Sequence, residues 1–91
     1  MRIHVVISIA VVIIGLMVEL TRIEWLFILF AIGGVITLEL LNTALERIVD
    51  LVTEDYHPLA KQAKDISAGA VFVYALLSVI VGTIIFLPKI L

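Results

Sequence analysis

Long stretches of apolar residues without charge alternate with short polar breaks along this chain. Residues 5–18 and 25–38 carry no charge, and in residues 66–87 the only ionisable group is Tyr74. A helix that crosses a membrane needs about 17–25 mostly apolar residues. The pattern therefore predicts three membrane spans, at about residues 3–20, 24–50 and 66–87.

The polar breaks carry signals for helix starts. Thr21 and Glu24 have the spacing of a capping box, in which each side chain accepts a hydrogen bond from a free backbone N–H group. The second helix is therefore predicted to start at Arg22, with Leu20 and Trp25 spaced as a hydrophobic staple.

A second break separates the second and third spans. The sequence Tyr56-His57-Pro58 interrupts the second helix, and proline is favoured in the first turn of a helix. We expect a loop over about residues 51–65, in which residues 58–65 form an amphipathic lead-in to the third span. Pro88 is expected to end that span, because proline breaks a helix.

Composition restricts the class of protein. Of the 91 residues, 64% are hydrophobic and 15% charged, against about 45–50% and roughly 25% in soluble domains. This excludes an ordinary soluble monomer and indicates one all-α integral membrane domain. A net charge of −2 without a basic run argues against a nucleic-acid partner, and the lack of cysteine excludes disulfides.

The first stretch also resembles a signal peptide, but no small-x-small cleavage site follows it, so we interpret it as a span. Basic residues near the spans indicate the orientation. They divide four against two, with Arg2, Arg47, Lys61 and Lys64 on one side and Arg22 and Lys89 on the other. The N-terminus and the 51–65 loop are therefore predicted to be cytoplasmic.

The second span ends in a polar face. At about 100° per residue, five polar residues fall within an arc of roughly 100°, namely Glu39, Asn42, Thr43, Glu46 and Asp50. If Trp25 marks the outer interface, Glu39 lies about 9 Å inside the inner edge of the membrane core. An acid there costs about 2.5–3.5 kcal/mol, which favours a functional role. Glu46 and Asp50 could also be solvated helix-end charges, with Asn42 joining helices.

Three acids on one face repel each other, and either a bound divalent cation or a set of basic partners would relieve the repulsion. Hard oxygen ligands with one or two carboxylates suit Mg²⁺. Lys64 is suited to holding phosphate oxygens, although it could simply extend its charge to the membrane surface. Asp65 could pair with Lys64, with Arg47 or with a metal. An acid below the headgroups with a lysine nearby favours phosphoryl transfer to a lipid hydroxyl, which needs no glycine-rich loop.

These residues carry a resemblance to a known family. The string Glu39-x-x-Asn42-Thr43-Ala-x-Glu46-x-x-x-Asp50, followed by Tyr56-His57 and Lys64-Asp65, resembles the small prokaryotic diacylglycerol kinases, in particular their Gram-positive undecaprenol kinase branch. The resemblance covers essentially the whole chain. It implies a homotrimer in the bacterial cytoplasmic membrane, with active sites shared between three-helix subunits.

The resemblance also implies the reaction and the site. The γ-phosphate of ATP would pass to a membrane lipid alcohol, undecaprenol first and diacylglycerol next, with Mg²⁺ required. By motif position, Glu39 would be the general base, Glu46 a Mg²⁺ ligand, and Asn42 and Asp50 supporting residues. Contacts to the nucleotide would come from Asp55, Tyr56, His57, Lys64 and Asp65.

Members of that family carry an amphipathic surface helix before the first span, and a glutamate at its end is the other Mg²⁺ ligand. Residues 1–4 stand where that motif has just ended. We therefore expect residues 1–91 alone to have little kinase activity, and the added segment to restore it.

Two other functions are open to such a chain. A proton- or ion-conducting oligomer needs one acid within the membrane, which leaves Asn42, Glu46, Asp50 and Lys64 without a role. A structural membrane protein needs only packing, and the small residues of the second and third spans fit either case.

Overall fold

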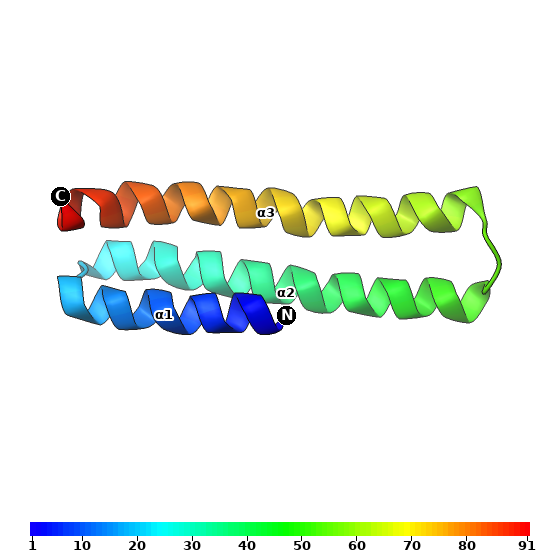
Figure 1. Cartoon of the computed structure of the whole chain (residues 1–91), viewed down its shortest axis with the longest axis horizontal. Coiled ribbons are helices and arrows are strands. Elements are labelled where there is room, and N and C mark those ends of the chain that lie inside the picture. The colour runs from blue at the N-terminus through cyan, green and yellow to red at the C-terminus, as the bar shows by residue number, and fades with distance from the viewer.

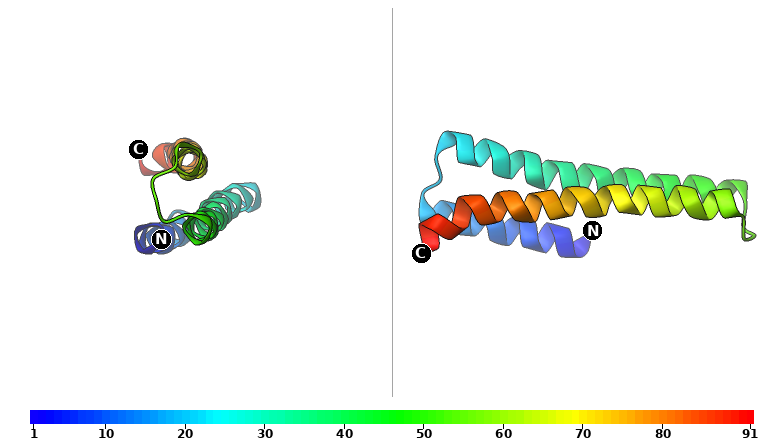
Figure 2. Two further views of the ribbon diagram at one scale, coloured as in Figure 1. Left: turned by 90° about the vertical axis from the view of Figure 1, so that its right-hand side faces the viewer. Right: turned by 90° about the horizontal axis from the view of Figure 1, so that it is seen from above.

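The computed structural model describes all 91 residues and contains three α-helices and no strands. They are α1 (Arg2–Val18), α2 (Arg22–Val52) and α3 (Pro58–Ile90). α1 and α3 both run antiparallel to α2, and the bundle measures 51 × 18 × 17 Å. α2 and α3 run its whole length, whereas α1 lies beside only the first half of α2 (Figure 1). Seen from the end, the three helices stand at the corners of a triangle (Figure 2).

The start of α2 confirms the capping box. The Glu24 backbone N–H donates to Thr21 Oγ1 at 3.2 Å, and the Thr21 N–H donates to Glu24 Oε1 at 2.9 Å. α1 ends at Val18, two residues before the predicted end of the first span, because Glu19 adopts a left-handed conformation with φ of 56°. The connection between the two helices is therefore only residues 19–21.

A glycine allows the chain to turn tightly there. Gly15 is buried, and a Cβ atom at this position would lie 2.9 Å from both Leu20 Cδ1 and Trp25 Cη2. Leu20 and Trp25, the two residues with staple spacing, thus both pack on α1 where Gly15 has no side chain. Their packing fixes the angle at which the chain enters α2.

The connection between α2 and α3 spans residues 53–57. His57 caps α3, since its Nδ1 accepts a hydrogen bond from the Leu59 N–H at 3.2 Å. Pro58 occupies the first turn of α3, as predicted. Residues 58–65 are helical and continuous with the third apolar stretch, so the non-helical part of the loop is short.

The prediction that Pro88 ends the third helix is wrong. α3 continues through Pro88 to Ile90, and the Leu91 N–H still donates to the Leu87 carbonyl. A proline in the last turn removes only one backbone hydrogen bond. Lys89 also anchors this turn, because its Nζ lies 3.1 Å from Glu24 Oε1 at the start of α2.

α2 and α3 pack closely on each other, and α1 packs much less closely on either. The Tyr74 hydroxyl of α3 donates to the Phe30 carbonyl of α2 at 2.9 Å. The Tyr74 ring lies over Gly34, so closely that a Cβ atom on this glycine would collide with it. These contacts set the antiparallel register of the two long helices.

Most apolar side chains face outward. Only Ile28, Val35 and Ile85 form a buried apolar core, with exposed fractions of 2%, 7% and 7%. α2 and α3 are long and apolar enough to cross a membrane, and α1 is a shorter apolar helix of 17 residues. A bundle with so small a buried core and so large an apolar outer surface is unsuited to an aqueous environment. The fold is that of an all-helical membrane protein.

The contact between Tyr74 and Gly34 gives a stability prediction. We expect Gly34→Ala to destabilise the bundle by about 1–3 kcal/mol, the usual cost of overpacking. Gly33→Ala is the matched control, because nothing lies within 4 Å of a Cβ atom there and alanine favours a helix over glycine. Unfolding in detergent, followed by circular dichroism, measures both, and equal stability of the two variants would contradict the close packing.

Candidate functional site

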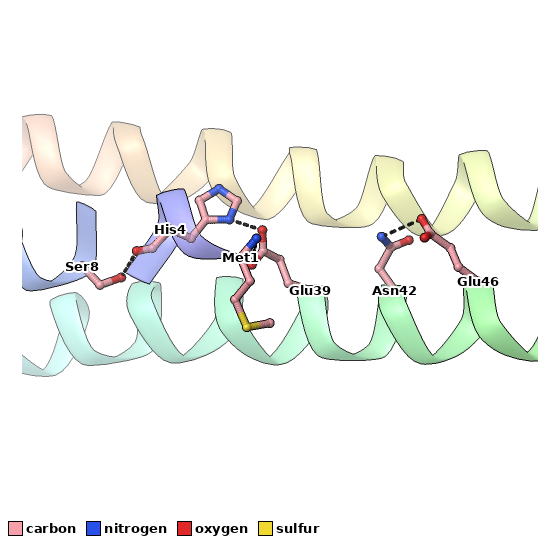
Figure 3. A network of polar contacts seen from close by, with 6 residues as sticks. All are labelled: Met1, His4, Ser8, Glu39, Asn42 and Glu46. Carbon is pink, nitrogen blue, oxygen red and sulfur yellow. Dashed lines mark hydrogen bonds and ion pairs between the residues drawn. The ribbon is translucent and has the colours of Figure 1, made fainter. Parts of the chain in front are cut away.

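The polar face predicted for α2 lies on the side where the helices meet. Glu39, Asn42 and Glu46 are half-buried, whereas Thr43 and Asp50 are exposed. Figure 3 shows the first three side chains in the space between α2 and the other helices. The face is thus divided into a sheltered part and an exposed end.

Glu39 has an asymmetric environment. Its Oε1 is hydrogen bonded to Nδ1 of His4 from α1 (Figure 3). Its Oε2 has no hydrogen-bond partner, and the amino group of Met1 lies 3.6 Å from it. The side chain is 14% exposed. One carboxylate oxygen is therefore hydrogen bonded to another helix, while the other makes no hydrogen bond and has only the longer ion-pair contact with Met1.

Asn42 and Glu46 form a second pair one turn further along α2. Asn42 Nδ2 donates to Glu46 Oε1 at 3.2 Å, and Asn42 Oδ1 is buried without a partner (Figure 3). The pair thus offers a carboxylate and an unused amide oxygen, the hard ligands that Mg²⁺ prefers. No group of three or more metal-ligating side chains exists in the chain. Mg²⁺ commonly uses one or two carboxylates and takes its other ligands from phosphates and water, so this donor set fits it.

A polar cavity of about 360 Å³ lies at the far end of the bundle. The end of α2, the connection and the start of α3 provide its ten lining residues, which are Val49, Asp50, Thr53, Glu54, Asp55, Tyr56, His57, Ala60, Lys61 and Lys64. Four of the five predicted nucleotide contacts are among them. The fifth, Asp65, does not line the cavity, and neither do Glu39, Asn42 and Glu46.

Ion pairs beside this cavity give Asp65 a partner that was not among those considered from the sequence. Lys64 Nζ lies 2.5 Å from Asp50 Oδ1, joining α3 to α2, and Lys61 Nζ lies 2.6 Å from Asp65 Oδ2 one turn away on α3. Asp65 therefore pairs with Lys61 rather than with Lys64 or Arg47. The hydrogen bond to Asp50 raises the pKa of Lys64 above its ordinary 10.5; burial opposes this rise, and the charges of Asp50 and Glu46 add to it.

Sequence reasoning did not place three residues at the site, namely His4, Glu54 and Lys61. Glu54 and Lys61 line the polar cavity, and their position beside Asp55 and Lys64 along the chain was the available signal. His4 contacts Glu39 across 35 positions of sequence. Only the antiparallel hairpin of α1 and α2 brings these two residues together.

These features define the class as a small helical membrane protein with an acidic helix face next to a polar cavity. The family model for prokaryotic diacylglycerol kinase matches residues 1–86. The chain belongs to the prokaryotic diacylglycerol kinase family, whose members are ATP-dependent lipid kinases.

Individual relatives agree with this assignment. Undecaprenol kinase from Bacillus subtilis is 57% identical over 86 residues, which are 94% of this chain and 70% of the relative. Diacylglycerol kinase from Synechocystis is 45% identical over 91 residues, 99% of this chain and 52% of the relative. Diacylglycerol kinase from Escherichia coli K12 is 30% identical over 74 residues, 81% of this chain and 61% of the relative. The matched part of the chain thus spans between 52% and 70% of the length of these relatives.

The Lys64–Asp50 contact predicts a pH response. Because the pKa of Lys64 is raised, its contribution to stability is fully present below pH 10.5 and is lost as the pH rises through the raised value. In Asp50→Asn, we expect the Lys64 titration, followed by NMR of the labelled side chain, to move down toward 10.5. Asp65→Asn is the control, since Asp65 pairs with Lys61. A Lys64 titration unchanged in Asp50→Asn would disprove the role of this pair.

Proposed function

We propose that the chain transfers the γ-phosphate of ATP to the hydroxyl of a membrane lipid alcohol, with undecaprenol as the preferred acceptor and diacylglycerol as the next. The observation that carries this proposal is the separation of two polar regions along α2. α1 begins beside the middle of α2 (Figure 1), where His4 contacts Glu39. The residues that line the polar cavity come from the end of α2, the connection and the start of α3. The similarity to Bacillus subtilis undecaprenol kinase supports the preferred acceptor.

All three helices cross the bacterial cytoplasmic membrane in this proposal, with the N-terminus and residues 53–57 on the cytoplasmic side. α1 has 17 residues, about 25 Å at 1.5 Å per residue. His4 lies about 21 Å from the end of α1, so Glu39, which contacts His4, lies at the same depth as counting from Trp25 gives, about 9 Å inside the inner edge of the membrane core. A lipid hydroxyl would reach about that depth.

Glu39 would act as the general base. Its free Oε2 takes the proton of the lipid hydroxyl, and the lipid oxygen then forms a bond to the γ-phosphorus. The bond from that phosphorus to the bridging oxygen breaks, and ADP leaves with the electron pair. Such a transfer depends mainly on in-line positioning and on neutralised charge. A half-buried carboxylate with one oxygen already held is positioned for this task.

Glu46 and Asn42 Oδ1 would hold Mg²⁺, which when bound neutralises charge on the phosphates of ATP. Lys64 would contact phosphate oxygens as a point charge, exchanging Asp50 for the nucleotide. Asp55, Tyr56 and His57 would contact the rest of the nucleotide from the cavity wall. His57 has only Nε2 available, because its Nδ1 caps α3. Asp65 would act through Lys61, its partner in the ion pair.

The active form would be a homotrimer with sites between neighbouring subunits. Large apolar side chains are exposed along all three helices, with Leu16 at 69%, Phe30 at 71% and Phe72 at 68%. Lipid covers part of such a surface in a membrane, and close helix contacts between subunits would cover the rest. The motif face of α2 is open toward the cavity end, where a neighbour would complete the site.

An acceptor comparison tests the reaction. The protein is assayed in detergent with ATP and Mg²⁺, both as residues 1–91 and preceded by the N-terminal surface helix of the Bacillus subtilis relative. We expect phosphorylated lipid from undecaprenol at a higher kcat/KM than from diacylglycerol, measured side by side. A reversed ratio would overturn the acceptor, and no phosphorylated lipid from either form would overturn the function.

Replacement of the base tests the mechanism. We expect Glu39→Gln to lower kcat by about 10²–10⁴-fold, the usual contribution of a general base, with helicity retained. Glu19→Gln is the matched control, because Glu19 is an exposed glutamate at the opposite end of the bundle. A kcat of Glu39→Gln equal to that of the control would show that Glu39 is not the general base.

A further inference from the structure

His4 is the only side chain of α1 that is hydrogen bonded to another helix. It lies in the first turn of α1 and reaches across to Glu39 on α2 (Figure 3). α1 packs only loosely elsewhere along its length. A single polar contact in a loosely packed helix therefore links this helix to the proposed base.

The contact engages one oxygen of the carboxylate and leaves the other free. His4 Nδ1 faces Oε1 of Glu39, whereas Oε2 has no hydrogen-bond partner. Because an ionised carboxylate accepts hydrogen bonds but cannot donate them, Nδ1 of His4 must carry a hydrogen. The bond therefore fixes the rotation of the carboxylate and determines which oxygen is presented.

Few other groups could hold Glu39. The charged group nearest to it is the amino group of Met1, 3.6 Å from Oε2. On α2, Asn42 and Glu46 bond to each other, and Thr37 and Thr43 are exposed. No side chain of α3 forms a hydrogen bond or an ion pair with Glu39. His4 is thus the one side-chain hydrogen-bond donor to Glu39.

We propose that His4 is the positioning residue for Glu39, holding Oε1 so that Oε2 faces the lipid hydroxyl. This rests on the proposed function, in which Glu39 is the base. His4 itself touches neither lipid nor nucleotide in the proposal, and it acts only through the orientation of the carboxylate. A misplacement of about 1 Å at a reacting group costs up to about 10²-fold in rate.

The hydrogen bond itself is tested first, without reference to activity. ¹⁵N NMR of histidine-labelled protein reports which ring nitrogen carries hydrogen. We expect Nδ1 of His4 to be protonated in the wild type, and the Nδ1-protonated fraction to fall in Glu39→Ala. His57 is an internal control with the opposite pattern, because its Nδ1 accepts from the Leu59 N–H. A His4 Nδ1 without hydrogen in the wild type would overturn the proposal.

The positioning role is tested by kinetics, in both forms of the protein described above. We expect His4→Ala to lower kcat by about tenfold to hundredfold while KM for ATP stays within about twofold. His4→Asn should recover much of kcat, because its amide supplies a donor near the position of Nδ1. Ser8→Ala is the control, since the Ser8 hydroxyl bonds only to the His4 carbonyl within α1.

The outcomes separate the two proposals. Lack of lipid kinase activity in both forms of the wild type refutes the proposed function, while the NMR result still decides whether the contact exists. An active wild type with equal kcat in His4→Ala refutes the positioning role alone. Equal losses in His4→Ala and His4→Asn, with helicity lost in both, would show a structural role instead and also refute it.

Discussion

The contact between α2 and α3 at Gly34 is the constraint on which the rest of this structure depends. Tyr74 fits against the helix there because the glycine has no side chain, and its hydroxyl reaches the Phe30 carbonyl. That contact fixes the register of two antiparallel helices of 31 and 33 residues. The same register brings Lys64 to Asp50 at the far end of the bundle. A shift by one turn would move these groups apart by about 5 Å and dissolve the polar cavity.

α1 is held differently, at its two ends rather than along its length. Leu20 and Trp25 pack over Gly15 at one end, and His4 bonds to Glu39 at the other. A polar group in an apolar setting is costly unless it finds a partner within the protein. The hydrogen bond to Glu39 therefore holds the start of α1 against α2, and α1 in turn reduces the exposure of Glu39. The environment of the proposed base is a consequence of where the first helix is attached.

Local features of this fold were predictable from sequence, and features set by packing were not. Thr21, Glu24 and Pro58 act on their own neighbours, so their spacing predicted both helix starts correctly. Pro88 was misjudged because the Lys89–Glu24 pair, which depends on α2, holds the last turn. The acids of α2 were placed on one face by periodicity alone, but the partners of Glu39 and Asp50 come from other helices. The partner of Glu39 that was missed, His4, follows from the geometry of a helical hairpin. His4 lies about 21 Å from the end of α1 and Glu39 about 26 Å from the start of α2, so both lie at a similar distance from the turn.

The unequal helix lengths give the proposed reaction its geometry. α2 has 31 residues and α1 has 17, so roughly 20 Å of α2 extends past the level of Glu39. If the length of α1 equals the thickness of the membrane core, this extension and the start of α3 lie in the cytoplasm. A lipid hydroxyl stays at the membrane surface and ATP stays in water, so an enzyme that joins them needs both places within one rigid element. The part of α2 that extends beyond α1 meets this requirement, because Glu39, Glu46 and Asp50 lie on one continuous helix face that leads from the membrane surface to the water.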